Sequence, residues 1–215
     1  MKKVAQTLCF LGLVFSFTLI TSIISYAAVV RVSGDNSWVV FINGEKVAEG
    51  ADWQHPTVSE FELKNNFAVI AVYVHDAEPG AAGVGGFLGD IILDDGTYIG
   101  TSDYEGDKED TWPGWKSDGG IVLADRKDGW EKTDFDDSNW DEPKEYDQFG
   151  GGVWGFGAAT MRGVLNNPDC LAHWIWHGPN DGEDDVYFRY TIGSLPVNSK
   201  GKLTTTWGKI KSSKL

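Results

Sequence analysis

The sequence predicts an all-β protein built as an antiparallel β-sandwich, and three observations support this fold class. First, Asn43-Gly44 lies between two runs of β-forming residues, and Asn-Gly tolerates the positive φ angles that a type I′ hairpin turn requires. Second, most of the remaining chain consists of short apolar runs separated by Gly, Asp and Asn. Third, no stretch beyond the N-terminal segment keeps the 3.6-residue apolar period of an amphipathic helix.

The apolar runs predict where the strands lie. Residues 67–74 are apolar on both faces, so this strand is expected to be central in a sheet and covered on both sides. Asp94-Asp95-Gly96 is expected to join residues 87–93 and 97–100 in a second hairpin, because Asp-Gly serves this turn as Asn-Gly does. Further strands are predicted at 29–33, 61–63, 173–177 and 186–192.

The chain divides into three predicted segments. Residues 1–27 have the basic start, apolar run and small residues near Ala27 that are typical of a signal peptide, with an uncleaved anchor as the alternative. Residues 28–193 form the β-sandwich, and residues 194–215 form a basic tail that is interpreted as a sorting or attachment tag. The protein is therefore expected to be secreted, in the periplasm or outside the cell, with association with the cell surface as an alternative and no membrane contact after cleavage.

Charge and cysteine content narrow the function classes. The net charge of −14 becomes −16 when Lys2 and Lys3 leave with the signal peptide, which argues against nucleic-acid and anionic-membrane partners. Such a surface suits divalent cations or neutral glycans, although acidity also simply keeps an exported protein soluble. Cys170 is the only cysteine after residue 27, so no intrachain disulfide can form, and it is predicted to be buried.

Five segments together resemble the galactose-binding-like β-sandwich, or jelly roll, found as a non-catalytic sugar-binding domain in bacterial α-L-rhamnosidases and family 2 glycoside hydrolases. These segments are Asp35-Asn36-Ser37-Trp38, residues 41–47, residues 66–72, residues 135–140 and Val186-Tyr187-Phe188-Arg189. The resemblance covers about residues 29–192 and implies a galactose-binding-like fold. No catalytic barrel follows, and the tail is not part of the pattern. A fold by itself does not define the ligand.

Ten tryptophans offer flat faces on which a sugar could stack. Trp38 and one of Trp174 and Trp176 are expected in the core, because alternate strand residues face opposite sides. Tryptophans in loops rich in Gly, Pro and Asp are the better ligand candidates, with burial as the alternative for each. The predicted ligand-binding residues are Trp53, His55, Trp112, Trp115 and Trp154.

Calcium is the one cofactor that the sequence suggests. It needs several oxygen ligands from a short loop, and an acidic turn before Trp140 could supply them. The predicted ligands are Asp134, Asp136, Asp137 and Asn139. Residues 180–185 are a second possible loop. In the alternative interpretation these side chains cap their own turns. A zinc site at His173 and His177 is rejected, since these residues lie about 13 Å apart along a strand.

The predicted function is non-catalytic carbohydrate binding by an exported monomer. No nucleophile motif is present, and the many acids give no specific carboxylate pair, so the chain is not expected to be an enzyme; a small glycosidase is the remaining catalytic alternative. The other alternative is a structural or adhesive surface protein that binds another protein or a matrix polymer. The two main hypotheses differ in whether the loop tryptophans gather on one exposed face or are buried separately.

Overall fold

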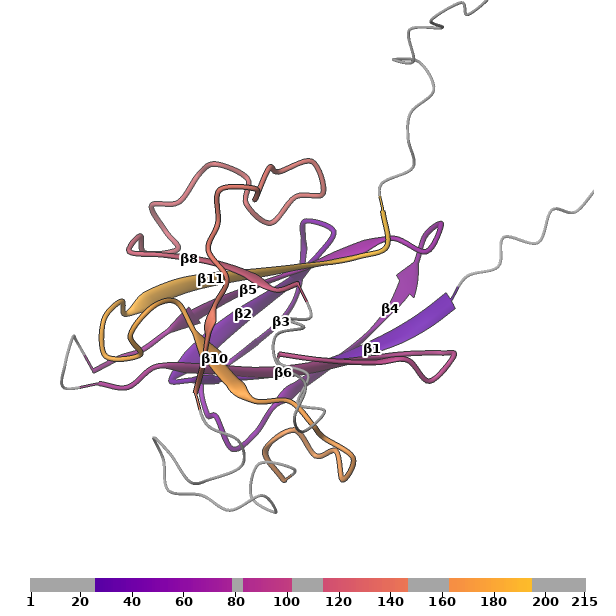
Figure 1. Ribbon diagram of the computed structural model, residues 1–215, viewed down its shortest axis with the longest axis horizontal. Coiled ribbons are helices and arrows are strands. Elements are labelled where there is room, and N and C mark those ends of the chain that lie inside the picture. The colour runs from indigo at the N-terminus through magenta and orange to yellow at the C-terminus, as the bar shows by residue number, and fades with distance from the viewer. Residues whose placement is uncertain (1–25, 79–82, 102–113, 147–162, 195–215) are drawn as a thin grey trace, which may run out of the picture.

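The protein is a two-sheet antiparallel β-sandwich (Figure 1), as predicted. The computed structural model describes residues 26–78, 83–101, 114–146 and 163–194. Sheet A comprises β1 (Tyr26–Asp35), β4 (Thr57–Leu63), β6 (Gly86–Leu93), β7 (Tyr98–Gly100), β9 (Lys144–Tyr146) and β10 (Trp174–Trp176), and its order is β4-β1-β6-β10-β9 with β7 also pairing β6. Sheet B comprises β2 (Ser37–Ile42), β3 (Glu45–Gly50), β5 (Ala68–His75), β8 (Lys116–Gly119) and β11 (Asp185–Ile192), in the order β3-β2-β5-β11-β8.

Both predicted hairpins are confirmed. Asn43 and Gly44 have φ angles of 53° and 88° and join β2 to β3, as a type I′ turn requires. The Asn43 side chain accepts a 2.9 Å hydrogen bond from the backbone N–H of Val69, which ties this turn to β5. The second hairpin joins β6 to β7, and Gly96 supplies its positive φ of 85°.

The prediction that residues 67–74 form a central strand is also confirmed, because β5 lies between β2 and β11. Its even-numbered residues, including Ile70 and Val72, enter the core between the sheets. Ala71 and Tyr73 face the other way and pack under Trp130. Both faces of β5 are therefore covered, which explains why the strand has no polar side.

Three apolar clusters hold the molecule together. The largest fills the space between the sheets and contains Trp38, as predicted, together with Trp176. The sequence predicted only one of Trp174 and Trp176 in the core, but both are buried, at 3% and 0% exposed. Trp174 points to the opposite side and joins a second cluster with Leu88 and Cys170, whose predicted burial is confirmed. The third cluster lies on the outer face of sheet B.

Irregular segments cover the outer faces of both sheets. Residues 163–173 supply much of the cluster against sheet A. Residues 120–141, which we call the cover segment, follow β8 and place Trp130, Phe135 and Trp140 on the outer face of sheet B. Figure 1 shows this segment looping beyond β8 and β11. Each sheet therefore has an apolar cluster on its outer face as well as on its inner face.

Two predicted strands are longer than expected. β1 extends from 26 to 35 rather than 29 to 33, and β4 from 57 to 63 rather than 61 to 63. The reason is their antiparallel pairing over seven residue pairs, from Tyr26 opposite Leu63 to Val32 opposite Thr57. Within the part of the chain described, no helix is long and apolar enough to cross a membrane.

Glycines permit the close approach of the large indoles. A Cβ on Gly50 would lie 2.2 Å from the Trp38 ring, and one on Gly85 would lie 2.3 Å from the Trp176 ring. Both rings are fully buried and cannot move aside. The two tryptophans therefore depend on glycine at these positions.

We predict that Gly50→Ala lowers the free energy of unfolding by about 1–3 kcal/mol, because the added methyl overpacks the Trp38 site. Chemical denaturation followed by tryptophan fluorescence measures this loss. Gly163→Ala is the matched control, since a Cβ there meets no atom within 4 Å. Equal stability of the two variants would contradict the packing argument.

Candidate functional site

The loop that contains two predicted ligand residues is built around one carboxylate. Residues 51–56, which we call the Trp53 loop, connect β3 to β4. Asp52 accepts a 3.0 Å hydrogen bond from the Gln54 backbone N–H and lies 2.8 Å from Nδ1 of His55. The Gln54 N–H and the His55 side chain both lower the pKa of Asp52. The loop is thus ordered by local hydrogen bonds.

Trp53 is anchored on one side and partly exposed on the other. Its carbonyl accepts a 2.6 Å hydrogen bond from the Ser33 hydroxyl, and its ring packs edge-to-face against Trp174, with the centroids 6.5 Å apart. The side chain of His55 is 79% exposed. The loop therefore presents part of an indole and an accessible imidazole on a fixed backbone.

Trp115 does not lie in a ligand-binding loop, contrary to the prediction. It is 1% exposed, donates a 3.0 Å hydrogen bond to the Gly100 carbonyl, and packs against Phe87 and Tyr190. β8 starts at the next residue, so the turn signal of the preceding Pro-Gly ends just before the ring enters the core. Trp112 and Trp154, the other two predicted tryptophans, lie outside the described residues.

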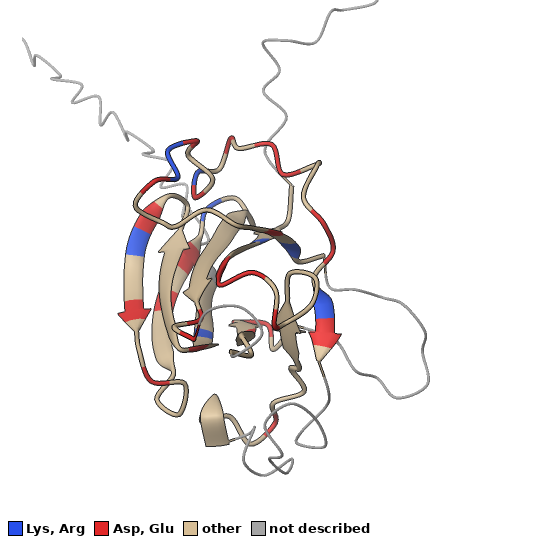
Figure 2. Ribbon diagram, turned by 90° about the vertical axis from the view of Figure 1, so that its left-hand side faces the viewer, with Lys and Arg blue, Asp and Glu red and all other residues tan. Residues whose placement is uncertain are grey.

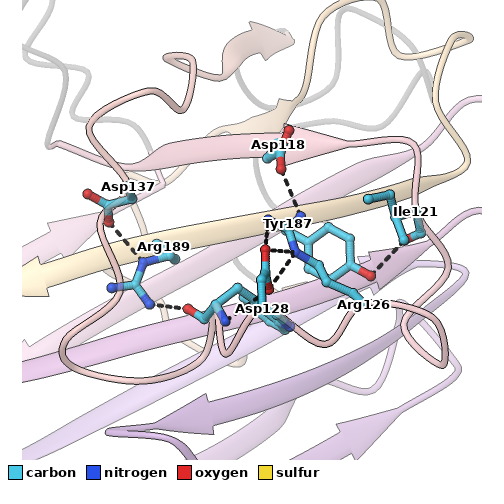
Figure 3. Close-up of polar contacts among 8 residues, drawn as sticks. Asp118, Ile121, Arg126, Asp128, Asp137, Tyr187 and Arg189 are labelled. Carbon is cyan, nitrogen blue, oxygen red and sulfur yellow. Dashed lines mark hydrogen bonds and ion pairs between the residues drawn. The ribbon is translucent and has the colours of Figure 1, made fainter.

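Two of the predicted calcium ligands accept hydrogen bonds from other groups of the protein. Asp137 accepts a 2.8 Å hydrogen bond from Nε of Arg189, and Asp136 accepts a 3.0 Å bond from the Ser138 backbone N–H (Figure 3 shows the arginine pair). The remaining two predicted ligands, Asp134 and Asn139, are exposed. In the described ranges, no three His, Cys, Asp or Glu side chains are grouped so that they could hold a metal ion.

Arg189 fixes the cover segment at one point. This arginine is 2% exposed and comes from β11. Besides Asp137 it donates to the carbonyls of Trp130 and Lys132, the latter at 3.1 Å, and its guanidinium lies 5.2 Å from the centre of the Phe135 ring. The hydrogen bonds of one side chain thus hold in place a turn that has no regular secondary structure.

Arg126 fixes the same segment at a second point (Figure 3). Its guanidinium makes ion pairs with Asp118 at 2.8 Å and Asp128 at 3.0 Å. It also stacks over Tyr187, 4.3 Å from the ring centre, and over Trp140, at 4.9 Å. The acids of this region therefore neutralise two buried arginines.

In the second possible calcium loop, residues 180–185, one acid is also bonded to other side chains of the protein. Asp185 accepts a hydrogen bond from the Tyr73 hydroxyl and lies 3.0 Å from Nδ1 of His75. Burial, followed by this carboxylate, raises the pKa of Tyr73. The histidines rejected as a zinc pair have different partners, with Glu145 beside His173 and Ser117 beside His177.

Sequence reasoning missed a hollow between the edge strands β3 and β4. Its volume is about 670 Å³. Its lining combines apolar, amide and acidic side chains from the two strands and the adjoining turns: Ile42, Asn43, Glu45, Val47, Glu60, Phe61, Glu62, Lys64, Asn65, Phe67 and Thr133. Alternation of charged and apolar residues in 60–62 was visible in the sequence, but the approach of β3 to β4 depends on how the two sheets stack.

Comparison with known proteins returns no match: no family model, no curated protein and no solved structure is significantly similar to this chain. The class of protein is therefore defined by its fold. The chain is an antiparallel two-sheet β-sandwich whose architecture is compatible with a jelly roll.

We predict that Asp137→Ala lowers the free energy of unfolding by about 2–3 kcal/mol, because it leaves the buried Arg189 charge without its carboxylate. Asp134→Ala, at an exposed position of the same turn, should change it by less than about 0.5 kcal/mol. Denaturation with and without a calcium chelator checks the assignment. A chelator-induced loss in the wild type that disappears in Asp137→Ala would favour a metal at this turn instead.

Asp76 gives a prediction about pH. It is 4% exposed, and burial raises its pKa from the ordinary 3.8 to about 6. Since the folded state holds this proton more tightly than the unfolded state does, stability from this group is present below about pH 4 and is lost as pH rises through about 6. Titration of Asp76 should lower the free energy of unfolding of the wild type by about 2 kcal/mol between pH 4 and 7. Asp76→Asn should not show this decrease.

The measurement is the difference in unfolding free energy between wild type and Asp76→Asn at pH 4, 5, 6 and 7. This difference cancels the titration of groups that the two proteins share. Asp134→Asn serves as the control for removing an exposed acid. A difference that stays constant over this range would show that Asp76 titrates alike in both states.

Proposed function

We propose that this is an exported, non-catalytic carbohydrate-binding protein of the galactose-binding-like type, and that the Trp53 loop contacts the glycan. The observation that carries the proposal is that this loop is held by hydrogen bonds and exposes an aromatic ring and an imidazole. Trp53 is the predicted ligand tryptophan that is both described and partly exposed, and it stands beside the exposed His55 on a hydrogen-bonded backbone.

The chemistry of the loop suits a sugar. A pyranose has an apolar face that stacks on an aromatic ring and hydroxyls that need fixed donors and acceptors. Trp53 supplies the ring, while Gln54 and His55 supply exposed polar groups. Because Asp52 orders the loop before any ligand arrives, binding costs little conformational entropy.

The surface charge is consistent with a neutral glycan. Figure 2 shows acidic residues in the loops and edge strands around the sandwich, with fewer basic residues among them. An uncharged ligand avoids the repulsion that an anionic polysaccharide would meet here. Calcium, which the acidic turn in the sequence suggests, remains part of the proposal and is to be tested with the glycan.

A structural or adhesive surface role is the second candidate. The observation in its favour is that Trp38, Trp115, Trp130 and Trp176 are each no more than 2% exposed. Many aromatic residues therefore stabilise the three apolar clusters, and tryptophan content is weak support for sugar binding. In this alternative the sandwich is a stable spacer, and a protein or matrix polymer is its partner.

We predict that the protein binds a defined glycan and that Trp53→Ala weakens binding about tenfold, because stacking on the ring is lost. A glycan array, first with calcium and then with a chelator, finds the ligand, and calorimetry measures the affinity. His55→Ala is the second variant, since it removes the exposed imidazole and keeps the Trp53 ring.

Val122→Ala, which removes an exposed side chain from the cover segment, is the matched control and should bind normally. Trp112→Ala and Trp154→Ala test the predicted residues outside the described ranges. A folded protein that binds no glycan would overturn the proposal and favour the structural role. Binding that is insensitive to both loop variants would overturn the placement of the site.

A further inference from the structure

We propose that the hollow between β3 and β4 is the docking site for the protein's own basic C-terminal segment, residues 195–215. The proposal does not depend on carbohydrate binding. It rests on the unpaired strand edges at the hollow, on the charge of its lining, and on the place where the chain leaves the described sandwich.

The hollow lies beside two strand edges with which no strand pairs in the described part of the chain. In the described sheets, β4 pairs only with β1, and β3 pairs only with β2. Each therefore has backbone N–H and C=O groups along one edge that no neighbouring strand uses. Such edges are common sites for the addition of an extended peptide, and proteins usually protect them.

The lining of the hollow is acidic. It contains Glu45, Glu60 and Glu62 but only one basic residue, Lys64. All three glutamates are exposed, and within the described part of the chain none of their side chains makes a hydrogen bond or ion pair. The lining also offers apolar surface, from Phe61 and from Val47, which is 42% exposed. A suitable occupant is thus basic and partly apolar.

The alternation on β4 defines this occupant further. Glu60 and Glu62 lie opposite Val29 and Ala27 of β1, and Phe61 between them packs toward the core. The C-terminal segment has five lysines and no acid, and Lys209-Ile210-Lys211 repeats the alternation with opposite charge. Beside β4 as an extended strand, it would place two lysines next to two glutamates and Ile210 on the side of Phe61.

The path of the chain brings the segment to this place. β11 ends at Ile192, and a Cβ on the following Gly193 would lie 2.0 Å from the carbonyl oxygen of Asn66. Asn65 and Phe67, on either side of Asn66, line the hollow. Figure 1 shows the end of β11 beside the turn that follows β4. The 15 residue-to-residue steps from Ser194 to Lys209 can span up to roughly 50 Å, which is ample.

The test is the rate at which chymotrypsin cleaves the full chain after Trp207, since chymotrypsin cleaves after aromatic residues and Trp207 is kept in every variant. Docking should protect it. Glu60→Lys with Glu62→Lys, or Lys209→Glu with Lys211→Glu, should each accelerate cleavage roughly 3- to 10-fold by replacing attraction with repulsion. The variant with all four changes restores opposite charges and should regain protection.

Glu142→Lys with Asp181→Lys is the matched control, because it makes the same charge change at exposed positions outside the hollow's lining. It should leave the rate unchanged. Equal rates in all variants, or no recovery in the four-fold variant, would overturn the proposal. Protection that rises with protein concentration, with a dimer in sedimentation experiments, would place the tail of a second copy in the hollow and overturn docking within one chain.

Discussion

The outer half of sheet B depends on the pairing of buried arginines with acids of the cover segment. Arg189 and Arg126 are 2% and 8% exposed, and a guanidinium so placed is tolerated only when carboxylates and carbonyls surround it. This requirement decides where the cover segment runs, because Asp137, Asp128 and two backbone carbonyls must come to the arginines. The aromatic rings of the segment are then brought over Tyr73 and Tyr187.

In this arrangement several acidic and aromatic residues have structural roles instead of the ligand-binding roles that the sequence suggests. In the sequence, a turn with three aspartates suggests calcium, and tryptophans among Gly and Pro suggest a sugar. In the folded protein, Asp137 is paired with an arginine, Asp136 accepts a turn N–H, and Trp115 is in the core. The two regions for which we propose ligands lie at the periphery of the described structure, on the Trp53 loop and in the hollow between β3 and β4.

The two peripheral regions differ in chemistry, and so they suit different partners. The Trp53 loop combines an aromatic ring with an amide and an imidazole and is ordered by Asp52, which fits a ligand with hydroxyls. The hollow combines carboxylates with strand edges, which fits a basic extended peptide. The loop connects β3 to β4, and these same strands border the hollow. A glycan and the C-terminal segment would thus be held by one pair of strands.

The sequence by itself determined the features that arise from local chemistry. Asn43-Gly44 and Asp95-Gly96 define hairpins because their backbones accept the necessary φ angles, and the apolar run of β5 predicts a strand covered on both faces. Only the tertiary structure decided which acids meet which arginines and which loop tryptophan stays accessible. Asp137 and Arg189 are 52 residues apart in the chain, and the hollow exists because two strands from different sheets stack edge by edge. Such contacts depend on how the sheets pack, which no local pattern encodes.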